Sequence, residues 1–152
     1  MKKLLTICLL IASFTTKAQT LEQTMDFIEA NVLRYTFDKL PSIRCSENAL
    51  QKTTTFGVPD NSRIDYMQLY MKDIKSVFFK TTDKGFIILT VVGNCTLYEN
   101  DKLMVDKVGP PRLIVGLVPS TPIENVNRII KAIKHAATLE GAKLLDDDLF
   151  KD

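Results

Sequence analysis

The chain has little of several residue types on which specialised protein classes depend. Among its 152 residues there is no tryptophan, one histidine and only three cysteines. Three cysteines are too few for a small domain built on disulfides. The formal net charge of +2 is too small for a general polyanion-binding protein. With 45% hydrophobic residues, the composition fits one ordinary globular domain and excludes a disordered acidic tail.

Standard motifs of catalysis and nucleotide binding are missing as well. The sequence holds no G-x-S-x-G, H-E-x-x-H, G-x-G-x-x-G or Walker pattern. His135 is the only histidine, and a zinc site needs more ligands than one histidine and two distant cysteines supply. We therefore expect no catalytic residue, no metal and no cofactor. An enzyme would need a cleft in which Asp65, Asp73 or His135 meets other polar groups.

The first 18 residues are typical of a secretory signal peptide. Lys2 and Lys3 precede an uncharged, mostly apolar run over residues 4–14, which is well short of the roughly 20 residues that span a bilayer. Small side chains before the expected site predict cleavage between Ala18 and Gln19. We therefore expect a periplasmic or secreted protein with no integral membrane segment after signal removal.

Cleavage would leave a nearly neutral chain of residues 19–152. Three lysines and no acids leave with the signal peptide, so 17 basic residues face 18 acidic ones. Because counterion-driven binding needs a surplus of lysine and arginine, nucleic acid is excluded as a general partner. No repeat or linker interrupts the segment, and its length fits a single globular domain.

Cleavage would also remove Cys8 and leave two cysteines in an oxidising compartment. An even number of thiols in such a compartment usually pairs. We therefore predict a disulfide between Cys45 and Cys95. Redox-active or metal-binding thiols are the alternatives, but the sequence has no C-x-x-C motif to support them.

The segment that follows the cleavage site predicts an amphipathic helix from about Leu21 to Arg34. Thr20 can cap this helix, and Gln23 can close a capping box. Its apolar stripe consists of Leu21, Met25, Ile28 and Val32. Phe27 lies off this stripe, which indicates that a second side of the helix is partly covered.

A second amphipathic helix is predicted near the C-terminus, ending at about Leu139. Thr121 is expected as its N-cap, Pro122 as its first residue and Gly141 as its stop signal. One continuous apolar face is formed by Ile123, Val126, Ile129, Ile130, Ile133, Ala136 and Ala137. A helix of this kind packs against a sheet.

Between the helices the sequence indicates an antiparallel sheet. Segments rich in β-branched and aromatic residues occur at 63–71, 74–80, 86–92, 95–98, 103–108 and 112–118. A further short strand is expected at the threonines 53–55. The connections are too short for parallel crossovers, so five to seven antiparallel strands follow. Gly93 and Asn94 are compatible with a turn or with a bulge in one long strand.

One candidate contact surface lies on the predicted strand 63–71. Because side chains alternate along a strand, either Tyr66 and Tyr70 or Met67 and Met71 face the core, and the other pair lies on the outer face. We single out the two tyrosines as candidates for that outer surface.

The other candidate surface is the polar face of the C-terminal helix. Arg128, Lys131 and His135 form a basic group there that could bind an acidic partner. Every amphipathic helix also needs a solvated polar face, and we favour that simpler interpretation of the group.

The C-terminal block STPIENVNRIIKAIKHAATLEGAKLLDDDLF resembles the closing segment of small uncharacterised exported bacterial proteins. They share a capped helix with an N-V-x-R-I-x-K-A-x-x-H pattern, then a glycine, a lysine and D-x-F. A sheet closed by such a helix also resembles the pleckstrin-homology-like barrel. The resemblance implies a fold and no activity.

These patterns together predict an α+β domain. It has an N-terminal helix, a bent antiparallel sheet or partly open barrel, and a C-terminal amphipathic helix packed on it. The alternative is a helix wrapped by a sheet, as in cystatin-like rolls. For function we favour an exported, non-enzymatic binding or accessory module whose partner is a protein or small ligand. A small periplasmic enzyme and a structural subunit of an envelope assembly are the alternatives.

Overall fold

The computed structural model describes residues 20–36, 43–46, 48–57, 63–99, 102–104 and 109–145. The predicted signal peptide and its cleavage site at Ala18 and Gln19 lie outside these residues. The same holds for residues 105–108 of a predicted strand. None of the described helices is long and apolar enough to cross a membrane.

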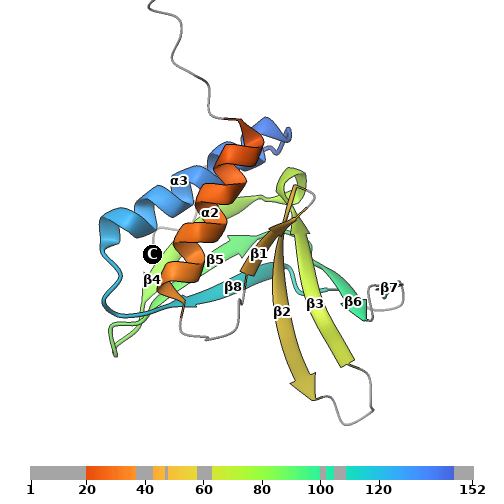
Figure 1. The fold of residues 1–152 in the computed structure, drawn as a ribbon, viewed down its shortest axis with the longest axis horizontal. Helices are drawn as coiled ribbons and strands as arrows, with labels where there is room; N and C mark the ends of the chain where they lie inside the picture. The colour runs from red at the N-terminus through yellow and green to blue at the C-terminus, as the bar shows by residue number, and fades with distance from the viewer. Residues whose placement is uncertain are drawn as a thin grey trace, which may run out of the picture.

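The described chain has an α+β fold (Figure 1). Its elements, in chain order, are α2 (Leu21–Tyr35), β1 (Ile43–Ser46), β2 (Ala49–Gly57), β3 (Arg63–Tyr70), the short 3₁₀ helix η1 (Met71–Asp73), β4 (Ser76–Thr81), β5 (Ile87–Val92), β6 (Thr96–Glu99), β7 (Lys102–Leu103), β8 (Arg112–Leu117) and α3 (Ile123–Leu139). All paired strands are antiparallel. The predicted fold class is therefore confirmed.

The strands form two sheets that do not close into a barrel. Their orders are β1-β2-β3-β6-β7 and β4-β5-β8. A long bent hairpin connects them, because Gln68 pairs with Thr96 in one sheet and Ser76 pairs with Val92 in the other. Between these two pairs the first side of the hairpin has residues 69–75 and the second side has only 93–95. The excess on the first side contains η1.

Gly93 lies at the bend between β5 and β6. From the sequence, this position was compatible with a turn or with a bulge in one long strand. A Cβ atom at this position would lie 2.6 Å from the carbonyl oxygen of Asp73 and 2.7 Å from a methyl carbon of Leu69. Only glycine lets the bent strand approach η1 this closely. The segment is thus a change of sheet, with the two strands continuing on either side of it.

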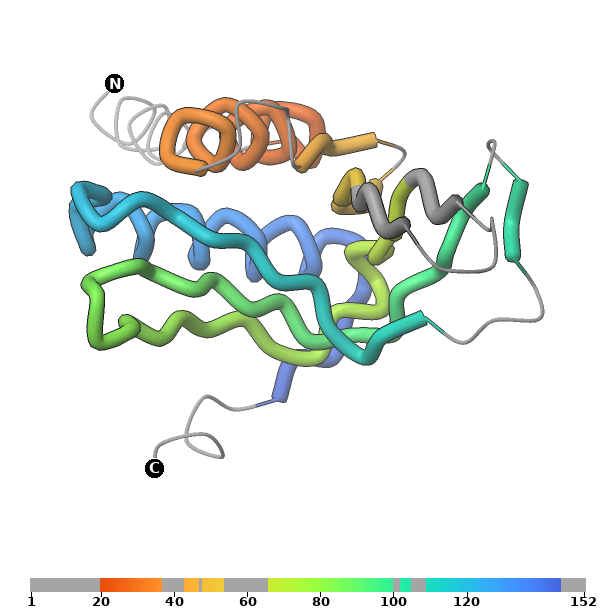
Figure 2. The backbone as a smooth tube through the Cα atoms, turned by 90° about the horizontal axis from the view of Figure 1, so that it is seen from below, coloured from red at the N-terminus to blue at the C-terminus, as the bar shows by residue number. Residues whose placement is uncertain are grey.

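The helices lie side by side and antiparallel, with α3 next to β4 and α2 next to β1 (Figures 1 and 2). The end of α2 meets the start of α3, where the Asn125 amide donates to the Tyr35 hydroxyl at 2.7 Å. The predicted apolar face of α3 is buried in the core, except that the side chain of Ile123 is 47% exposed. Neither helix is wrapped by a sheet, unlike the cystatin-like alternative.

The N-cap prediction is confirmed for one helix and wrong for the other. For α2 the capping box is confirmed, since the Thr20 hydroxyl accepts from the Gln23 backbone N–H and the Gln23 side chain accepts from the Thr20 N–H. For α3 the predicted N-cap is wrong. Pro122 occupies that position, and the Thr121 hydroxyl instead donates to the Val118 carbonyl at 2.6 Å, which closes the preceding turn.

The C-terminal stop of α3 is confirmed at Gly141. Its φ is +82°, the left-handed conformation that favours glycine after a helix. The N–H of Ala142 then donates to the carbonyl of Ala137, which ends the helix. Further along, the N–H of Leu145 donates to the carbonyl of Lys75, so the chain after α3 is held next to β4.

The predicted disulfide is absent, and both Cys45 and Cys95 are free thiols. Cys45 is opposite Leu50, which is opposite Leu69. The β3–β6 register, continued by one residue, puts Leu69 opposite Cys95. Two strands therefore separate the cysteines, and at about 4.8 Å per strand this row is roughly 14 Å long. A disulfide holds Cα atoms only about 4.4–6.8 Å apart.

Candidate functional site

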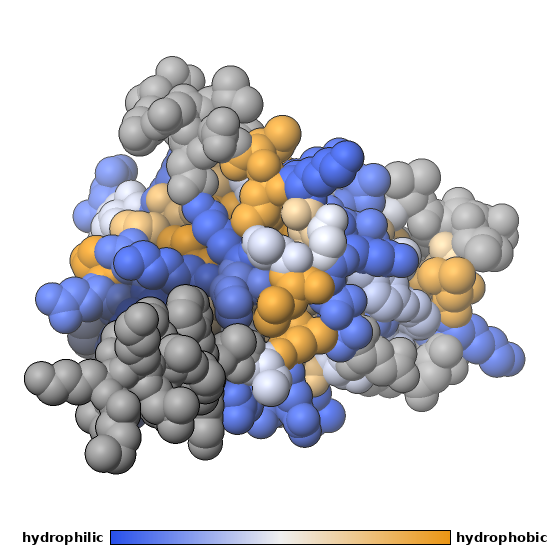
Figure 3. All heavy atoms as spheres, turned by 90° about the horizontal axis from the view of Figure 1, so that it is seen from above, coloured by the Kyte–Doolittle hydropathy of each residue, from blue (hydrophilic) through white to orange (hydrophobic). Residues whose placement is uncertain are grey.

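A groove of about 550 Å³ lies between the two helices. Its described lining consists of Phe27 from α2 and of Arg128, Lys131, Ala132 and His135 from α3. Figure 3 looks onto the side of the molecule that carries the helices, where apolar side chains lie among charged ones. The structure therefore brings the three basic residues predicted from the sequence into one concave surface.

The helical repeat explains why these α3 side chains share the groove. Lys131 and Ala132 come three and four residues after Arg128, and His135 comes four and three residues after them, which places all four on one face. The opposite face of α3 is buried against the core, so this row is held toward α2 and solvent. The groove is consequently built on rigid helix and not on a loop.

Phe27 gives the groove an aromatic wall. Its ring centroid lies 5.7 Å from the guanidinium carbon of Arg128, a cation–π distance. This contact holds a flexible side chain in place on the exposed surface. Sequence reasoning did not assign Phe27 to the site. The available signal was its position off the buried stripe of α2.

The groove is suited to attracting negative charge. Arg128, Lys131 and His135 are exposed, and no carboxylate is found in the part of the lining that the structure describes. Arginine and lysine donate hydrogen bonds to carboxylate and phosphate groups. The described lining contains neither a nucleophile nor a carboxylate that could pair with His135.

The two candidate tyrosines lie elsewhere, on β3. Met71 is fully buried and Met67 packs against the core, so the tyrosines are the outer pair. Tyr66 stacks on Tyr98 with ring centroids 4.8 Å apart, and the Tyr70 and Tyr98 hydroxyls lie 3.4 Å apart. All three are half-buried. The predicted tyrosine surface is therefore a packed aromatic cluster, separate from the basic groove.

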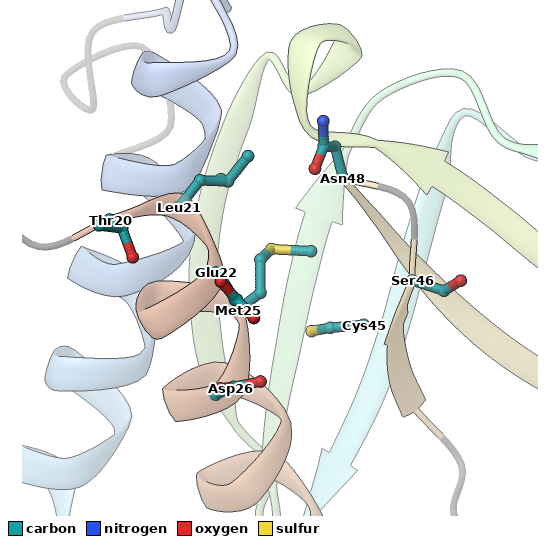
Figure 4. Close-up of a pocket in the computed structure, with 8 residues that line it drawn as sticks. All are labelled: Thr20, Leu21, Glu22, Met25, Asp26, Cys45, Ser46 and Asn48. Carbon is teal, nitrogen blue, oxygen red and sulfur yellow. The ribbon is translucent and has the colours of Figure 1, made fainter.

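A second pocket, of about 430 Å³, lies between the start of α2 and the β1–β2 turn (Figure 4). Met25 and Cys45 point toward one another across it. The remaining lining residues are Thr20, Leu21, Glu22, Asp26, Ser46 and Asn48. The described lining of this pocket contains the carboxylates of Glu22 and Asp26 and no basic residue. The pocket is therefore acidic, whereas the groove is basic.

The thiol in this pocket is not an activated nucleophile. The pKa of Cys45 is raised from its ordinary value of 9.0 to about 12, mainly by burial and also by the negative charges of Glu29 and Asp26, while a hydrogen bond with Glu29 lowers it in part. Separately, the Cys45 backbone N–H donates to the Glu29 carboxylate at 2.8 Å. Because the thiolate is the reactive form, a protonated thiol does not support covalent catalysis here.

No metal site is found in the described part of the chain, where no three histidine, cysteine, aspartate or glutamate side chains are grouped to hold an ion. Asp73, one of the residues that an enzyme would need, is exposed at η1, and the Asp65 side chain lies outside the described set.

Known proteins add no relative, since no protein-family model, curated protein or solved structure matches this chain. The resemblance of the C-terminal block to small exported proteins stays a prediction.

Proposed function

We propose that this chain is an exported, non-enzymatic binding or accessory module that contacts an anionic partner through the groove between α2 and α3. The observation that carries the proposal is the lining of that groove. Three basic side chains and one aromatic ring converge on one concave surface, on a rigid helix pair. The signal-like N-terminus supports action in the periplasm or outside the cell.

Contacts at two of the described sheet edges, β1 and β8, favour this function over a structural subunit that assembles through those strands. At β1, the Cys45 N–H is bound by Glu29. At β8, the Lys52 ammonium donates to the Ile114 carbonyl at 2.6 Å, and Thr36 pairs with Leu117. Edge groups engaged in this way do not offer a free template to another strand.

The proposal is tested by titrating the purified protein with a short polyglutamate peptide and following backbone amide shifts by NMR. We expect saturable shifts confined to residues 27 and 128–135. In the variant R128E/K131E these shifts disappear, because the basic side chains that attract the peptide are reversed in charge.

The matched control is K80E/K102E, which changes the net charge equally at two exposed lysines outside the groove. This control should bind the peptide as the parent protein does. Equal loss in both variants would show that only the overall charge matters, and the proposed site would be wrong.

A further inference from the structure

We infer that the groove receives an amphipathic α-helix of a partner protein, with carboxylates along one stripe and apolar side chains along the next. This inference rests on the proposed function and names the kind of partner that the same groove takes. It is drawn from the shape, the charge spacing and the apolar floor of the groove.

The shape favours an elongated guest. The groove follows two antiparallel helices, and its lining extends along α3 from Arg128 to His135. Seven residues of helix correspond to about 10 Å along the axis, which is two turns. Furrows of this kind accept the side-chain ridge of another helix. A single small anion would contact only part of this length.

The charge spacing matches helical periodicity. The steps from Arg128 to Lys131 and from Lys131 to His135 rise about 4.5 and 6 Å along α3. An antiparallel guest helix with carboxylates at i, i+4 and i+7 has the same two steps in reverse order. In an extended peptide, side chains on one face recur about every 6.7 Å. Three such side chains span roughly 13 Å, which is roughly 3 Å longer than the distance along α3 from Arg128 to His135.

The floor of the groove requires apolar groups on the guest. Phe27 and Ala132 are the apolar residues of its described lining. One turn beyond His135 on the same face of α3, the side chain of Leu139 is 49% exposed. These surfaces remain hydrated under a purely ionic ligand, whereas leucine or alanine side chains of a guest helix would cover them.

The backbone of the groove does not suit a phosphate group. Phosphate sites in proteins commonly use free N–H groups at a helix N-terminus. All the lining residues are in helix interiors, between the ends of α2 and α3, where the helix itself uses the backbone N–H groups. Recognition therefore depends on side chains alone, as in the docking of one helix onto others.

The test compares two synthetic peptides of about four helical turns with identical composition. One carries glutamates at i, i+4 and i+7 beside a leucine stripe, and the other has the same residues scrambled so that no stripe forms. Inorganic phosphate and phosphatidylcholine vesicles containing about one-third phosphatidylglycerol are the other probes. Binding is followed by fluorescence anisotropy and by amide shifts.

We expect the striped peptide to bind about tenfold more tightly than the scrambled one. Only the striped peptide can place its carboxylates on the basic side chains and its leucines on the apolar floor of the groove at the same time. It should gain helix on binding. R128E/K131E and F27A should both weaken it, and K80E/K102E should leave it unchanged. Equal binding of the two peptides, or stronger binding of phosphate or vesicles at the groove, would overturn the helix inference and leave the proposed function standing.

Two further outcomes are decisive. If no anionic probe shifts the groove residues, the proposed function fails together with the inference. If sedimentation shows that the protein dimerises and that R128E/K131E is monomeric, the occupant is a second copy of this chain and the inference is wrong. Circular dichroism of each variant establishes that it is folded.

Discussion

At the scale of single residues, the two cysteines show how an environment determines reactivity. Cys45 is half-buried and Cys95 is buried, and burial is the main cause that raises the pKa of Cys45 to about 12 and that of Cys95 to about 11. A thiol with a pKa of 9.0 is about one-tenth ionised at pH 8. Each unit by which the pKa rises lowers the thiolate population about tenfold. Neither side chain therefore behaves as an ordinary free cysteine.

We expect both thiols of the folded protein to react with a maleimide or a disulfide reagent at pH 8 at least about a hundredfold more slowly than free cysteine. The labelling rate should keep rising with pH beyond 9, because the thiolates form only near pH 11–12. After denaturation without reductant, both Cys45 and Cys95 should label rapidly. Protection that persists in denaturant would contradict the free thiols of the structure.

At the scale of elements, the bend at Gly93 decides how two sheets arise from one hairpin. The extra residues of the first strand form η1, and its carbonyl at Asp73 lies against the backbone of Gly93. This close approach lets β3 and β6 leave the plane of β4 and β5. Helix α3 then lies next to β4, while β1 flanks α2.

Gly93→Ala is expected to lower the free energy of unfolding by about 1–3 kcal/mol, because the new methyl group overlaps a backbone carbonyl that cannot move independently. Gly141→Ala is the control. It has the strained φ of +82° but no atom within 4 Å of the new Cβ, so strain alone costs about 1–2 kcal/mol. Urea unfolding measures both. A cost at Gly93 clearly below that at Gly141 would contradict this account of the bend.

The elements also show which features the sequence could predict. Strong periodicity and turn residues were enough for α2, α3 and the strands from 63 to 92, because these signals are local. The β1–β2 hairpin was missed apart from the threonines 53–55. Its turn uses Asn48 at a φ of 60° in place of a glycine, so the usual hairpin signal is weak.

The site was predicted in part. The basic row of α3 is a one-helix pattern, and Arg128, Lys131 and His135 could be read from the sequence. Phe27 could not be assigned to it, because the side of α2 that meets α3 depends on tertiary packing. The disulfide was predicted because an even number of cysteines remains after signal cleavage. That number contains no information on the two strands that lie between Cys45 and Cys95.

At the scale of the whole molecule, contacts from other elements reach the described sheet edges at β1 and β8 and the backbone just before β4. Glu29 of α2 binds β1, Lys52 of β2 binds β8, and Leu145 binds the backbone beside β4. Charged side chains on edges are a known protection against strand-to-strand association. The backbone groups engaged in this way are not free to pair with a strand of another molecule.

Lys52→Ala is expected to expose the Ile114 carbonyl on the edge of β8. The loss of the ammonium contact should cost about 1 kcal/mol of stability. It should also speed aggregation on mild heating, followed by light scattering, because the edge loses its charge. Lys80→Ala, at an exposed lysine of β4, is the control and should aggregate like the parent. Equal aggregation of the two variants would show that Lys52 does not protect the edge.

The position of the groove in the chain has a consequence for folding. Its walls come from the first and last described elements, and the hydrogen bond that joins them at Tyr35 and Asn125 connects residues 90 positions apart. Contacts of such high contact order form late, because the loop between them must first be closed. The groove therefore exists only once the two ends of the described chain have met, and a partner that binds it selects molecules in which α2 and α3 are docked over those in which they are apart.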